Sequence, residues 1–365
     1  MLKIGNYSIF YSFLKEKRIK TKDMKLELDI KLDFKDVLIR PKRSNLSSRK
    51  EVNLEREITF RNCDRKWKGI PLIAANMDTI GTFEMYRELS CVKIITCFHK
   101  HYTLEDFQTV KKHLDPNFYM ISTGISEDDW FKLVDIIKLL DPMFVCVDVA
   151  NGYMDSLLEF TLRLRKNYPN IVIACGNVVT RELVEDLSVR AGVNIIKCGI
   201  GSGGVCTTRL QTGVGMPQLS AVSECADAAH GLDSCIISDG GITVPGDIAK
   251  ALGAGADFVM MGSILAGHTE CAGQLMQEGG KAFKIFYGMS SDTAMKKYSG
   301  GVAPHRSSEG KTVKVAFKGP VKNTVDKILG GLRSSCTYIG ASRIKDMPKC
   351  TTFVRVNSQV NNIFT

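Results

Sequence analysis

The sequence predicts a (β/α)₈ TIM barrel, a single domain with a long active-site flap, and three features of the chain support this fold. Eight short β-rich runs alternate with segments of helical length. Each run is almost continuously apolar, as expected for parallel strands that helices cover on one face and barrel side chains fill on the other. Polar and glycine residues follow every run. Because a strand count does not show closure, an open doubly wound sheet remains the structural alternative.

The expected strands and helices alternate along most of the chain. The strands occupy residues 71–75, 92–98, 118–122, 144–149, 171–175, 194–198, 235–239 and 257–261. Segments with the length and periodicity of helices occupy residues 127–140, 154–167, 181–191 and 245–252. Gly192 and Gly253 act as stop signals for two of these helices, because glycine commonly terminates a helix.

The residues that follow the strands predict where the active site lies. They are residues 76–78, 99–100, 123–124, 148–152, 176–177, 199–206, 239–241 and 262–263. In an α/β barrel the loops at the carboxyl ends of the strands build the active site, and phosphate is commonly bound after strands seven and eight. Residues 240–241, 262–263 and 288–290 supply the backbone N–H groups that an anionic phosphate requires.

Composition predicts a soluble, cytoplasmic globular protein with reduced thiols. The 365 residues are 44% hydrophobic and 24% charged, and no apolar stretch approaches the roughly 20 residues that span a bilayer, so no membrane partner is expected. The twelve cysteines include no C-x-x-C pair, and we find no hydrophobic signal segment. Six of them lie in or beside apolar runs and are expected to be small buried hydrophobes: Cys91, Cys97, Cys146, Cys175, Cys198 and Cys235.

The net charge of +10 is partly concentrated at the start of the chain. Residues 1–22 carry six Lys or Arg against one acid, Glu16, which gives +5. A nucleic-acid contact, a membrane contact or a transit peptide are alternatives to a solvated tail, but the arginine content is low. We expect residues 1–25 to form a basic extension with no assigned function, residues 26–365 to form the barrel domain, and nucleic acid not to be a partner. The remaining +5 agrees with phosphorylated ligands.

One loop carries the strongest chemical signal in the chain. Residues 199–209, Gly-Ile-Gly-Ser-Gly-Gly-Val-Cys-Thr-Thr-Arg, end an apolar run in glycines and then present Cys206 beside two threonines. Glycine allows close approach of a ligand, and a cysteine thiolate is a strong nucleophile near neutral pH. Gly199, Gly201 and Gly204 also match the G-x-G-x-x-G dinucleotide spacing, but we reject this reading because no helix is expected before about Pro217.

A second long segment is the candidate flap. Residues 280–318 are rich in Gly, Ser and Lys and show little apolar periodicity. A connection of this length is usually a functional lid or a disordered segment, and a solvated surface loop is the alternative. A C-terminal segment, residues 319–365, follows it.

Four motifs together give the chain a family resemblance. They are Gly-Val-Cys-Thr-Thr-Arg at 204–209, Ser-Asp-Gly-Gly at 238–241, Tyr-Gly-Met-Ser-Ser-Asp-Thr-Ala-Met at 287–295 and Glu-Gly-Lys-Thr-Val at 309–313. From about Leu32 to its last residues, the chain resembles the GMP reductases of the IMP dehydrogenase/GMP reductase family. Two features of the related IMP dehydrogenases are missing. Only about fifteen residues separate Tyr102 from the strand at Phe118, where those enzymes carry a regulatory domain, and the chain contains no Arg-Tyr dipeptide.

The resemblance implies an oxidoreductase of purine nucleotide interconversion and salvage. It implies that NADPH reduces GMP to IMP and ammonia through a covalent thioimidate on Cys206, and that Thr208 and Glu309 supply the proton for the departing amine. An NAD-dependent IMP oxidoreductase and a non-catalytic nucleotide- or RNA-binding protein are the alternatives. The resemblance also implies a homotetramer.

The resemblance assigns further residues by position. GMP and IMP are expected to contact Ser202, Asp239, Gly240, Gly241, Gly262, Ser263, Gly288, Met289, Ser290, Arg306, Ser307, Ser308 and Gly310. NADPH is expected to contact Ser48, Arg49, Lys100, Asp148, Val149, Ala150, Ile200, Gly201, Met289, His305 and Arg306, and, from a neighbouring subunit, Ser334, Ser335, Cys336 and Thr337. A potassium ion is expected at main-chain carbonyls of Gly201, Gly203 and Cys206, with Arg209 nearby.

Some of these residues have structural alternatives, and some depart from the family pattern. Asp239 is expected on the ribose hydroxyls, although it could cap the turn after its strand, and Lys100 and Arg49 are either phosphate partners or solvated. Ser202 stands where the family usually has proline, Gly204 where it has serine, and His305 before the lid arginine where an aromatic or polar residue is usual. Loss of a proline adds freedom to the unliganded loop, and we expect function to be retained with altered affinity.

Overall fold

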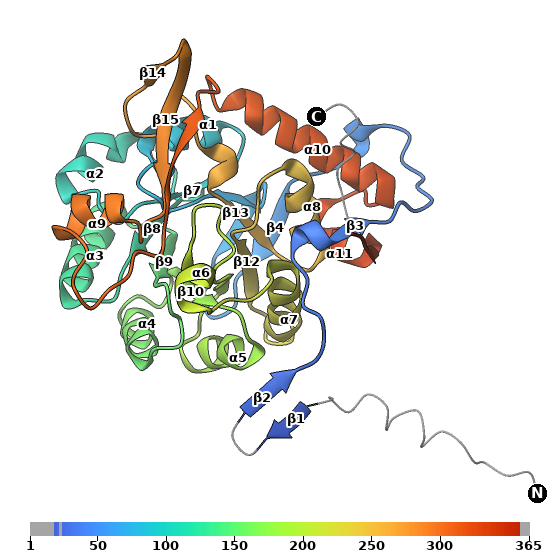
Figure 1. The fold of residues 1–365 in the computed structure, drawn as a ribbon, viewed down its shortest axis with the longest axis horizontal. Coiled ribbons are helices and arrows are strands. Elements are labelled where there is room, and N and C mark those ends of the chain that lie inside the picture. The colour runs from blue at the N-terminus through green and yellow to red at the C-terminus, as the bar shows by residue number, and fades with distance from the viewer. Residues whose placement is uncertain (1–17, 22–23, 358–365) are drawn as a thin grey trace, which may run out of the picture. The chain divides into compact units, whose positions relative to one another are not determined.

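A computed structural model describes residues 18–21 and 24–357, and its centre is a closed barrel of eight parallel strands (Figure 1). The strands are β6 (Leu72–Ala74), β7 (Ile95–Phe98), β8 (Tyr119–Thr123), β9 (Phe144–Asp148), β10 (Val172–Val178), β11 (Ile195–Cys198), β12 (Cys235–Asp239) and β13 (Phe258–Met261). They neighbour one another in chain order, and β13 pairs with β6 in register Met260↔Ile73. The predicted barrel is therefore confirmed, and the open sheet is excluded.

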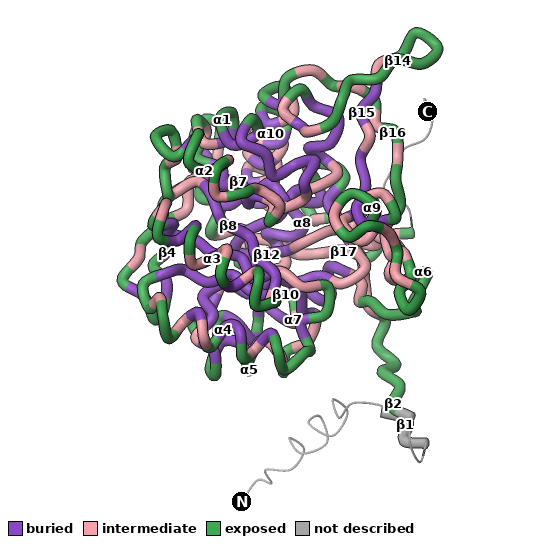
Figure 2. The backbone as a smooth tube through the Cα atoms, turned by 90° about the vertical axis from the view of Figure 1, so that its left-hand side faces the viewer, coloured by how far each residue is buried: buried purple, intermediate pink, exposed green. Residues whose placement is uncertain are grey.

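Helices surround the barrel. They are α1 (Phe83–Cys91), α2 (Leu104–Val110), α3 (Glu127–Leu140), α4 (Asp155–Asn167), α5 (Arg181–Arg190), α7 (Gln218–His230) and α8 (Pro245–Gly253). Helix α3 has the predicted bounds because Ser126 accepts a hydrogen bond from the backbone N–H of Asp129, Asp129 caps in return, and Asp141 ends the helix in the left-handed region at φ 46°. The strands are buried while the outer helix faces are exposed (Figure 2).

An antiparallel hairpin closes the amino-terminal end of the barrel. It consists of β4 (Arg56–Thr59) and β5 (Lys66–Gly69). Trp67 is 1% exposed, contacts the ring of Phe258 at 5.1 Å between centroids, and donates a hydrogen bond from Nε1 to the carbonyl of Asn117 at 2.8 Å. Phe60 contacts Phe144 edge to face. Because Phe144 and Phe258 are the first residues of their strands, this cluster seals that end.

The segment predicted as an irregular flap contains regular structure, which corrects the expectation of little periodicity. Strands β15 (Lys281–Tyr287) and β16 (Thr312–Ala316) pair antiparallel, and α9 (Asp292–Ser299) lies between them in the sequence. Strand β14 (Met276–Glu278), which precedes the predicted segment, pairs with β15 and completes a three-stranded sheet. Phe283 and Phe286 are buried. The sheet forms because β15 is long enough to pair with both neighbours while it buries these aromatic side chains.

The C-terminal segment packs on the barrel. It contains α10 (Lys322–Ile339), α11 (Met347–Cys350) and β17 (Phe353–Arg355), and β17 pairs antiparallel with β3 (Val37–Ile39). Short 3-10 helices lie at Phe34–Asp36, Arg49–Glu51, Lys111–His113, Ser263–Leu265 and Ile344–Asp346. None of the helices in the described ranges has the length and apolar character needed to cross a membrane.

Contacts divide the chain after Lys31 into two units. In the first unit, β1 (Arg18–Thr21) and β2 (Met24–Glu27) form an antiparallel hairpin. Most of the predicted basic extension, residues 1–17 and 22–23, lies outside the described residues. The boundaries predicted for the extension and the barrel domain stay predictions.

The cysteines are free thiols. Cys97, Cys146, Cys175 and Cys198 are buried as expected, and burial raises the pKa of the Cys175 thiol to about 12. Cys235 is only partly buried. The expectation is wrong for Cys91, which is exposed because it is the last residue of α1 and faces away from the barrel core.

Candidate active site

The site is built around a chain of three side chains that come from two distant segments. Cys206 lies in the loop after β11, and its Sγ donates to Thr208 Oγ1 at 3.2 Å. Thr208 Oγ1 donates to Glu309 Oε2 at 2.7 Å. A thiol, a hydroxyl and a carboxylate in this order can pass a proton between a sulfur nucleophile and a general acid or base.

Main-chain pairing holds the flap segment against the cysteine loop. The N–H of Thr207 donates to the carbonyl of Glu309 at 2.7 Å, and the N–H of Lys311 donates to the carbonyl of Val205 at 2.9 Å. Cys206 and Gly310 form an isolated antiparallel bridge. The position of the Glu309 carboxylate is therefore set by backbone hydrogen bonds on both sides of it.

A short helix, α6 (Thr208–Thr212), begins directly after the cysteine and corrects the expectation that no helix starts before about Pro217. It ends at Gly213, which adopts φ 71°. The helix is too short for apolar periodicity to predict it. The rejected dinucleotide reading gains nothing from it, because the loop follows the sixth barrel strand and not the first.

Arg209 lies outside the cavity lining and stabilises the cysteine loop. Its Nη1 lies 3.0 Å from Asp33 Oδ2, and its Nη2 donates to the carbonyl of Met216 at 2.6 Å. Its aliphatic part packs against Gly201, where φ is 77° and an added Cβ would lie 2.6 Å from Arg209 Cγ. Only glycine fits at this position.

The unusual Ser202 connects the cysteine loop to the loop after β12. Its Oγ donates to the carbonyl of Asp239 at 3.1 Å, and its own carbonyl accepts the N–H of Gly241 at 2.9 Å. Proline has no side-chain hydroxyl with which to make the first of these bonds. At the other departure, Gly204, an added Cβ would lie 3.3 Å from Ser263 Oγ, so a larger residue there requires a small shift of Ser263.

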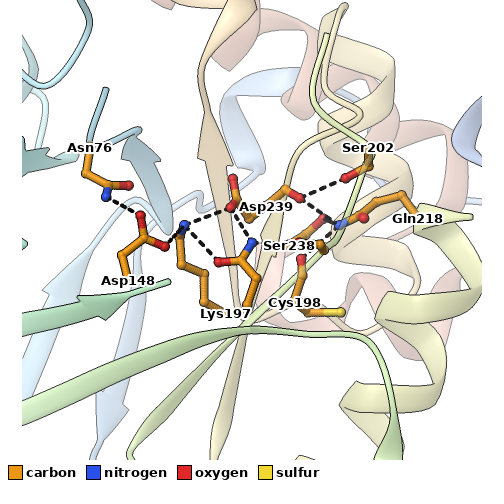
Figure 3. A network of polar contacts seen from close by, with 10 residues as sticks. Asn76, Asp148, Lys197, Cys198, Ser202, Gln218, Ser238 and Asp239 are labelled. Carbon is orange, nitrogen blue, oxygen red and sulfur yellow. Dashed lines mark hydrogen bonds and ion pairs between the residues drawn. The ribbon is translucent and has the colours of Figure 1, made fainter. Parts of the chain in front are cut away.

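A buried ammonium group joins two carboxylates across the cavity (Figure 3). Lys197 Nζ lies 2.8 Å from Asp148 Oδ1 and 2.8 Å from Asp239 Oδ2. Asn177 donates to the same Asp239 oxygen at 2.8 Å and accepts from Lys197 Nζ at 3.1 Å, while Asn76 Nδ2 donates to Asp148 Oδ2 at 2.6 Å. The Asp239 carboxylate therefore takes part in this network instead of capping its own turn.

The network keeps Lys197 and Asp148 ionised. Desolvation alone would raise the pKa of Asp148, but the nearby Lys197 ammonium and the hydrogen bonds from Lys197 and Asn76 hold it below its usual value. Desolvation would lower the pKa of Lys197, but the two carboxylates raise it well above the ordinary value. Lys197 is therefore a cation, and Asp148 an anion, at neutral pH.

A second buried carboxylate attaches the flap to the barrel. Asp78, which follows β6, accepts from Tyr287 at 2.5 Å and Tyr298 at 2.6 Å, and Lys297 Nζ lies 2.9 Å away. Burial would raise the pKa of Asp78, but these three donors hold it below its usual range. Because β15 and α9 supply all three donors, Asp78 is the anchor of the flap.

Replacing Asp78 with alanine is expected to loosen the flap. The change leaves two phenol groups without their acceptor, at a cost of about 1–3 kcal/mol each where they are buried. We expect trypsin to cleave Asp78→Ala after the exposed Arg306 faster than it cleaves the wild type. Mass spectrometry of the fragments measures the two cleavage rates. Asp135→Ala, on the exposed face of α3, is the control, and equal cleavage rates in the two variants would contradict the anchor.

One cavity of about 780 Å³ gathers most of the predicted site residues. It is lined by Lys100, Asp148, Val149, Ala150, Ile200, Gly201, Ser202, Gly203, Cys206, Thr208, Asp239, Gly240, Gly241, Gly262, Ser263, Gly288, Met289, Ser290, Arg306 and Glu309. Loops after the barrel strands and the flap both contribute to it. Most of the residues predicted to serve catalysis, the nucleotide and the cofactor therefore line one cavity.

Other predicted residues lie elsewhere in this single chain. They are Ser48, Arg49, Arg209, His305, Ser307, Ser308, Gly310, Ser334, Ser335, Cys336 and Thr337, none of which lines the cavity. Gly310 forms an isolated bridge with Cys206, and Ser308 Oγ donates to the carbonyl of Gly310 at 3.1 Å. Cys336 is a fully buried residue of α10, so its side chain packs in the core.

Sequence reasoning left Lys197 unassigned, although a lysine within a strand of apolar residues is a recognisable signal. The sequence places Asn76, Asp78 and Asn177 at the carboxyl ends of the barrel strands but assigns them no role. Tyr287 and Tyr298 gave no local signal, because their partner, Asp78, is more than 200 residues away.

Comparison with known proteins agrees with this geometry. A model of the IMP dehydrogenase / GMP reductase domain matches residues 31–362. The chain belongs to the IMP dehydrogenase/GMP reductase family. It is 55% identical over 350 residues to a GMP reductase of Shigella boydii serotype 18 and of Escherichia coli O157:H7, and 54% identical over 345 residues to one of Aeromonas hydrophila subsp. hydrophila. Each alignment covers 93% of this chain and 99% of the relative, so the predicted family is confirmed.

Metal binding by side chains finds no support in the described part of the chain, where no group of three or more His, Cys, Asp or Glu residues is arranged to hold an ion. A potassium ion held by main-chain carbonyls is a different case, because it uses oxygen atoms that every residue carries. The Arg209 guanidinium is itself a cation and pairs with Asp33. Any contribution of Arg209 to such a site is therefore limited to its carbonyl.

Proposed function

We propose that this protein is an NADPH-dependent GMP reductase that converts GMP to IMP and ammonia. The observation that carries the proposal is the hydrogen-bonded series Cys206, Thr208 and Glu309 at the edge of the cavity. The GMP reductases that align with nearly the whole chain support the same activity. The proposed role of this reaction is the interconversion and salvage of purine nucleotides.

The chemistry assigned to the chain's own residues has two stages. In the first, the Cys206 sulfur bonds to the purine C2, and the bond from C2 to the exocyclic amine breaks as Thr208 and Glu309 deliver the proton that makes the amine leave as ammonia. In the second, C2 of the covalent thioimidate gains a hydride, and the C–S bond breaks to return the sulfur with its electron pair. NADPH, when bound, supplies the hydride.

The nucleotide subsite is assigned to the loops around β12 and β13. Ser202, Gly240, Gly241, Gly262 and Ser263 surround the end of the cavity where backbone N–H groups can hold the phosphate. The Asp239 carboxylate is proposed to bind the ribose hydroxyls. Residues of the flap are proposed to bind the base and close over it: Gly288, Met289, Ser290, Arg306, Ser307, Ser308 and Gly310.

The cofactor subsite is assigned to the other side of the same cavity. The residues that line it there are Lys100, Asp148, Val149, Ala150 and Ile200. The cationic side chain of Lys100 suits a phosphate group of the nicotinamide nucleotide. Gly201 is proposed to contact the cofactor, and Met289 and Arg306 are proposed to contact both ligands. Ser48, Arg49, His305 and, from a neighbouring subunit, Ser334, Ser335, Cys336 and Thr337 are proposed to complete the cofactor site.

Further proposals concern the ion, the assembly and the location. A potassium ion at the carbonyls of Gly201, Gly203 and Cys206 suits the cysteine loop, because carbonyl oxygens are hard ligands and glycines let several of them converge. The protein is proposed to be a cytoplasmic homotetramer whose small-molecule partners are GMP and IMP, with no nucleic-acid or membrane partner.

The test is an assay of the purified full chain with potassium present. We expect GMP to cause oxidation of NADPH, which is measured as a fall in absorbance in the near ultraviolet. IMP and ammonia are expected to form in equal amounts. Formation of NADH and XMP from IMP would assign the chain to the related dehydrogenase activity. Salt-sensitive retention of RNA with neither reaction would overturn the proposal in favour of a binding protein.

A further inference from the structure

Lys197 stands between the two subsites and is the centre of a network that neither subsite contains alone. Its side chain is 4% exposed and projects from β11, four residues before Gly201. One carboxylate that it contacts, Asp148, lies on the side proposed for the cofactor, and the other, Asp239, lies on the side proposed for GMP. The same ammonium group therefore touches one residue of each subsite.

Stability alone gives a poor reason for a lysine at this position. The neighbouring residues of β11, Ile195, Ile196 and Cys198, are buried and apolar. Placing a charged group in a protein interior carries a desolvation penalty that its ion pairs do not always repay, and an apolar side chain of similar volume is often as stable. Lys197 lines the cavity, so its charge is available to the ligands that enter it.

The charges around Lys197 make its effect specific. Two carboxylates face one ammonium, so the group of three carries a net charge of −1 when all are ionised. The other charged or titratable groups that face it are Lys100, which acts on Asp148, and the thiols of Cys97 and Cys146. The neutral amides of Asn76 and Asn177 complete the contacts. Without the ammonium, two carboxylates would face each other across a poorly solvated gap.

We propose that Lys197 is a positioning residue that holds Asp148 and Asp239 in their productive orientations at once, and so couples binding in the nucleotide subsite to binding in the cofactor subsite. This inference rests on the proposed function for the identity of the two ligands. The coupling is reciprocal, because binding of one ligand that orders its carboxylate through Lys197 also orders the carboxylate that serves the other.

The test compares Lys197→Met with Lys197→Arg and with a matched buried lysine. Methionine removes the charge and keeps the length, while arginine keeps the charge. Lys250→Met is the control, because Lys250 is also buried, also lies near a carboxylate, Asp247 at 3.7 Å, and sits on the outer helix α8. Thermal unfolding of all four proteins shows which of them are folded before any ligand is added.

The first readout is binding of GMP to each full-length protein, measured by calorimetry with and without NADP⁺ present. In the wild type we expect NADP⁺ to change the affinity for GMP by roughly 5-fold or more, the usual size of a coupling between sites. In Lys197→Met this ratio is expected to fall to about 1, and Lys197→Arg is expected to restore part of it. Lys250→Met is expected to behave as the wild type.

The second readout is kinetic. Misplacement of a reacting group by about 1 Å costs on the order of 100-fold in rate, so kcat of Lys197→Met is expected to fall by about that factor, with KM for both substrates raised. The acid limb of kcat/KM is expected to move to higher pH, because the pKa of Asp148 rises once Lys197 no longer holds it down. A merely structural lysine would shift neither this limb nor the coupling ratio.

The outcomes separate this inference from the proposed function. A folded Lys197→Met protein with the wild-type coupling ratio and pH profile overturns the inference and leaves the proposed function standing. If the wild type fails to turn over GMP but still binds it, the proposed function falls, and the coupling ratio alone decides the role of Lys197. If the wild type neither turns over nor binds GMP, both are overturned.

Discussion

Replacing Cys206 with alanine is expected to reduce GMP-dependent oxidation of NADPH to background while GMP binding stays close to that of the wild type. The sulfur is the atom proposed to bond to C2, whereas the phosphate and ribose are proposed to bind residues of other loops. Alanine removes only the Sγ and its hydrogen bond to Thr208, so the loop held by Arg209 is expected to keep its shape. Steady-state kinetics and calorimetry with GMP measure the two effects.

Alkylation gives a second measurement for the same residue. We expect iodoacetamide to inactivate the wild type at a rate that saturating GMP slows, with the label found on Cys206 by mass spectrometry. Cys91→Ala is the control, because Cys91 is an exposed thiol remote from the cavity lining, and its loss is expected to leave activity unchanged. Turnover that survives Cys206→Ala would rule out the covalent mechanism.

The second large effect is expected for Glu309→Gln. Glutamine keeps an oxygen that accepts the Thr208 hydroxyl, now 2.7 Å from Glu309 Oε2, but it cannot carry the proton that the leaving amine requires. A general acid or base is typically worth about 10²- to 10⁴-fold, so kcat is expected to fall within that range with a smaller change in KM. Glu182→Gln, exposed on α5, is the matched control.

A double variant tests whether the two residues act as a unit. If Thr208 and Glu309 share one proton path, Thr208→Val and Glu309→Gln together are expected to cost little more than the worse single change, because effects within a catalytic unit are not additive. Losses that multiply would show two independent roles. An unchanged kcat in Glu309→Gln would remove the carboxylate from the mechanism altogether.

The barrel was predictable from the sequence because its signals are local. Apolar runs marked the strands, and the capping residues Ser126 and Asp129 fixed the start of α3. The predicted bounds of the strands were less accurate. The run at 92–98 forms a strand only from Ile95, because Val92 caps α1 and Lys93 turns with φ 59°.

The site was predictable only in part, because its remaining contacts join distant segments. The family resemblance placed Cys206, Thr208 and Glu309 in one site, because the two motifs that contain them, residues 204–209 and 309–313, are each contiguous in the sequence. The attachment of Tyr287 and Tyr298 to Asp78 depends on how the flap folds back over the barrel, which no local pattern records. The pairing of Lys197 with both carboxylates depends on three different strands.

The hairpin that carries Trp67 fills the amino-terminal end of the barrel with packed aromatic side chains. Ligands therefore reach the cavity from the carboxyl ends of the strands, among the loops and the flap that line it. Patterns of product inhibition against each reactant are expected to show whether the two products leave in a fixed order.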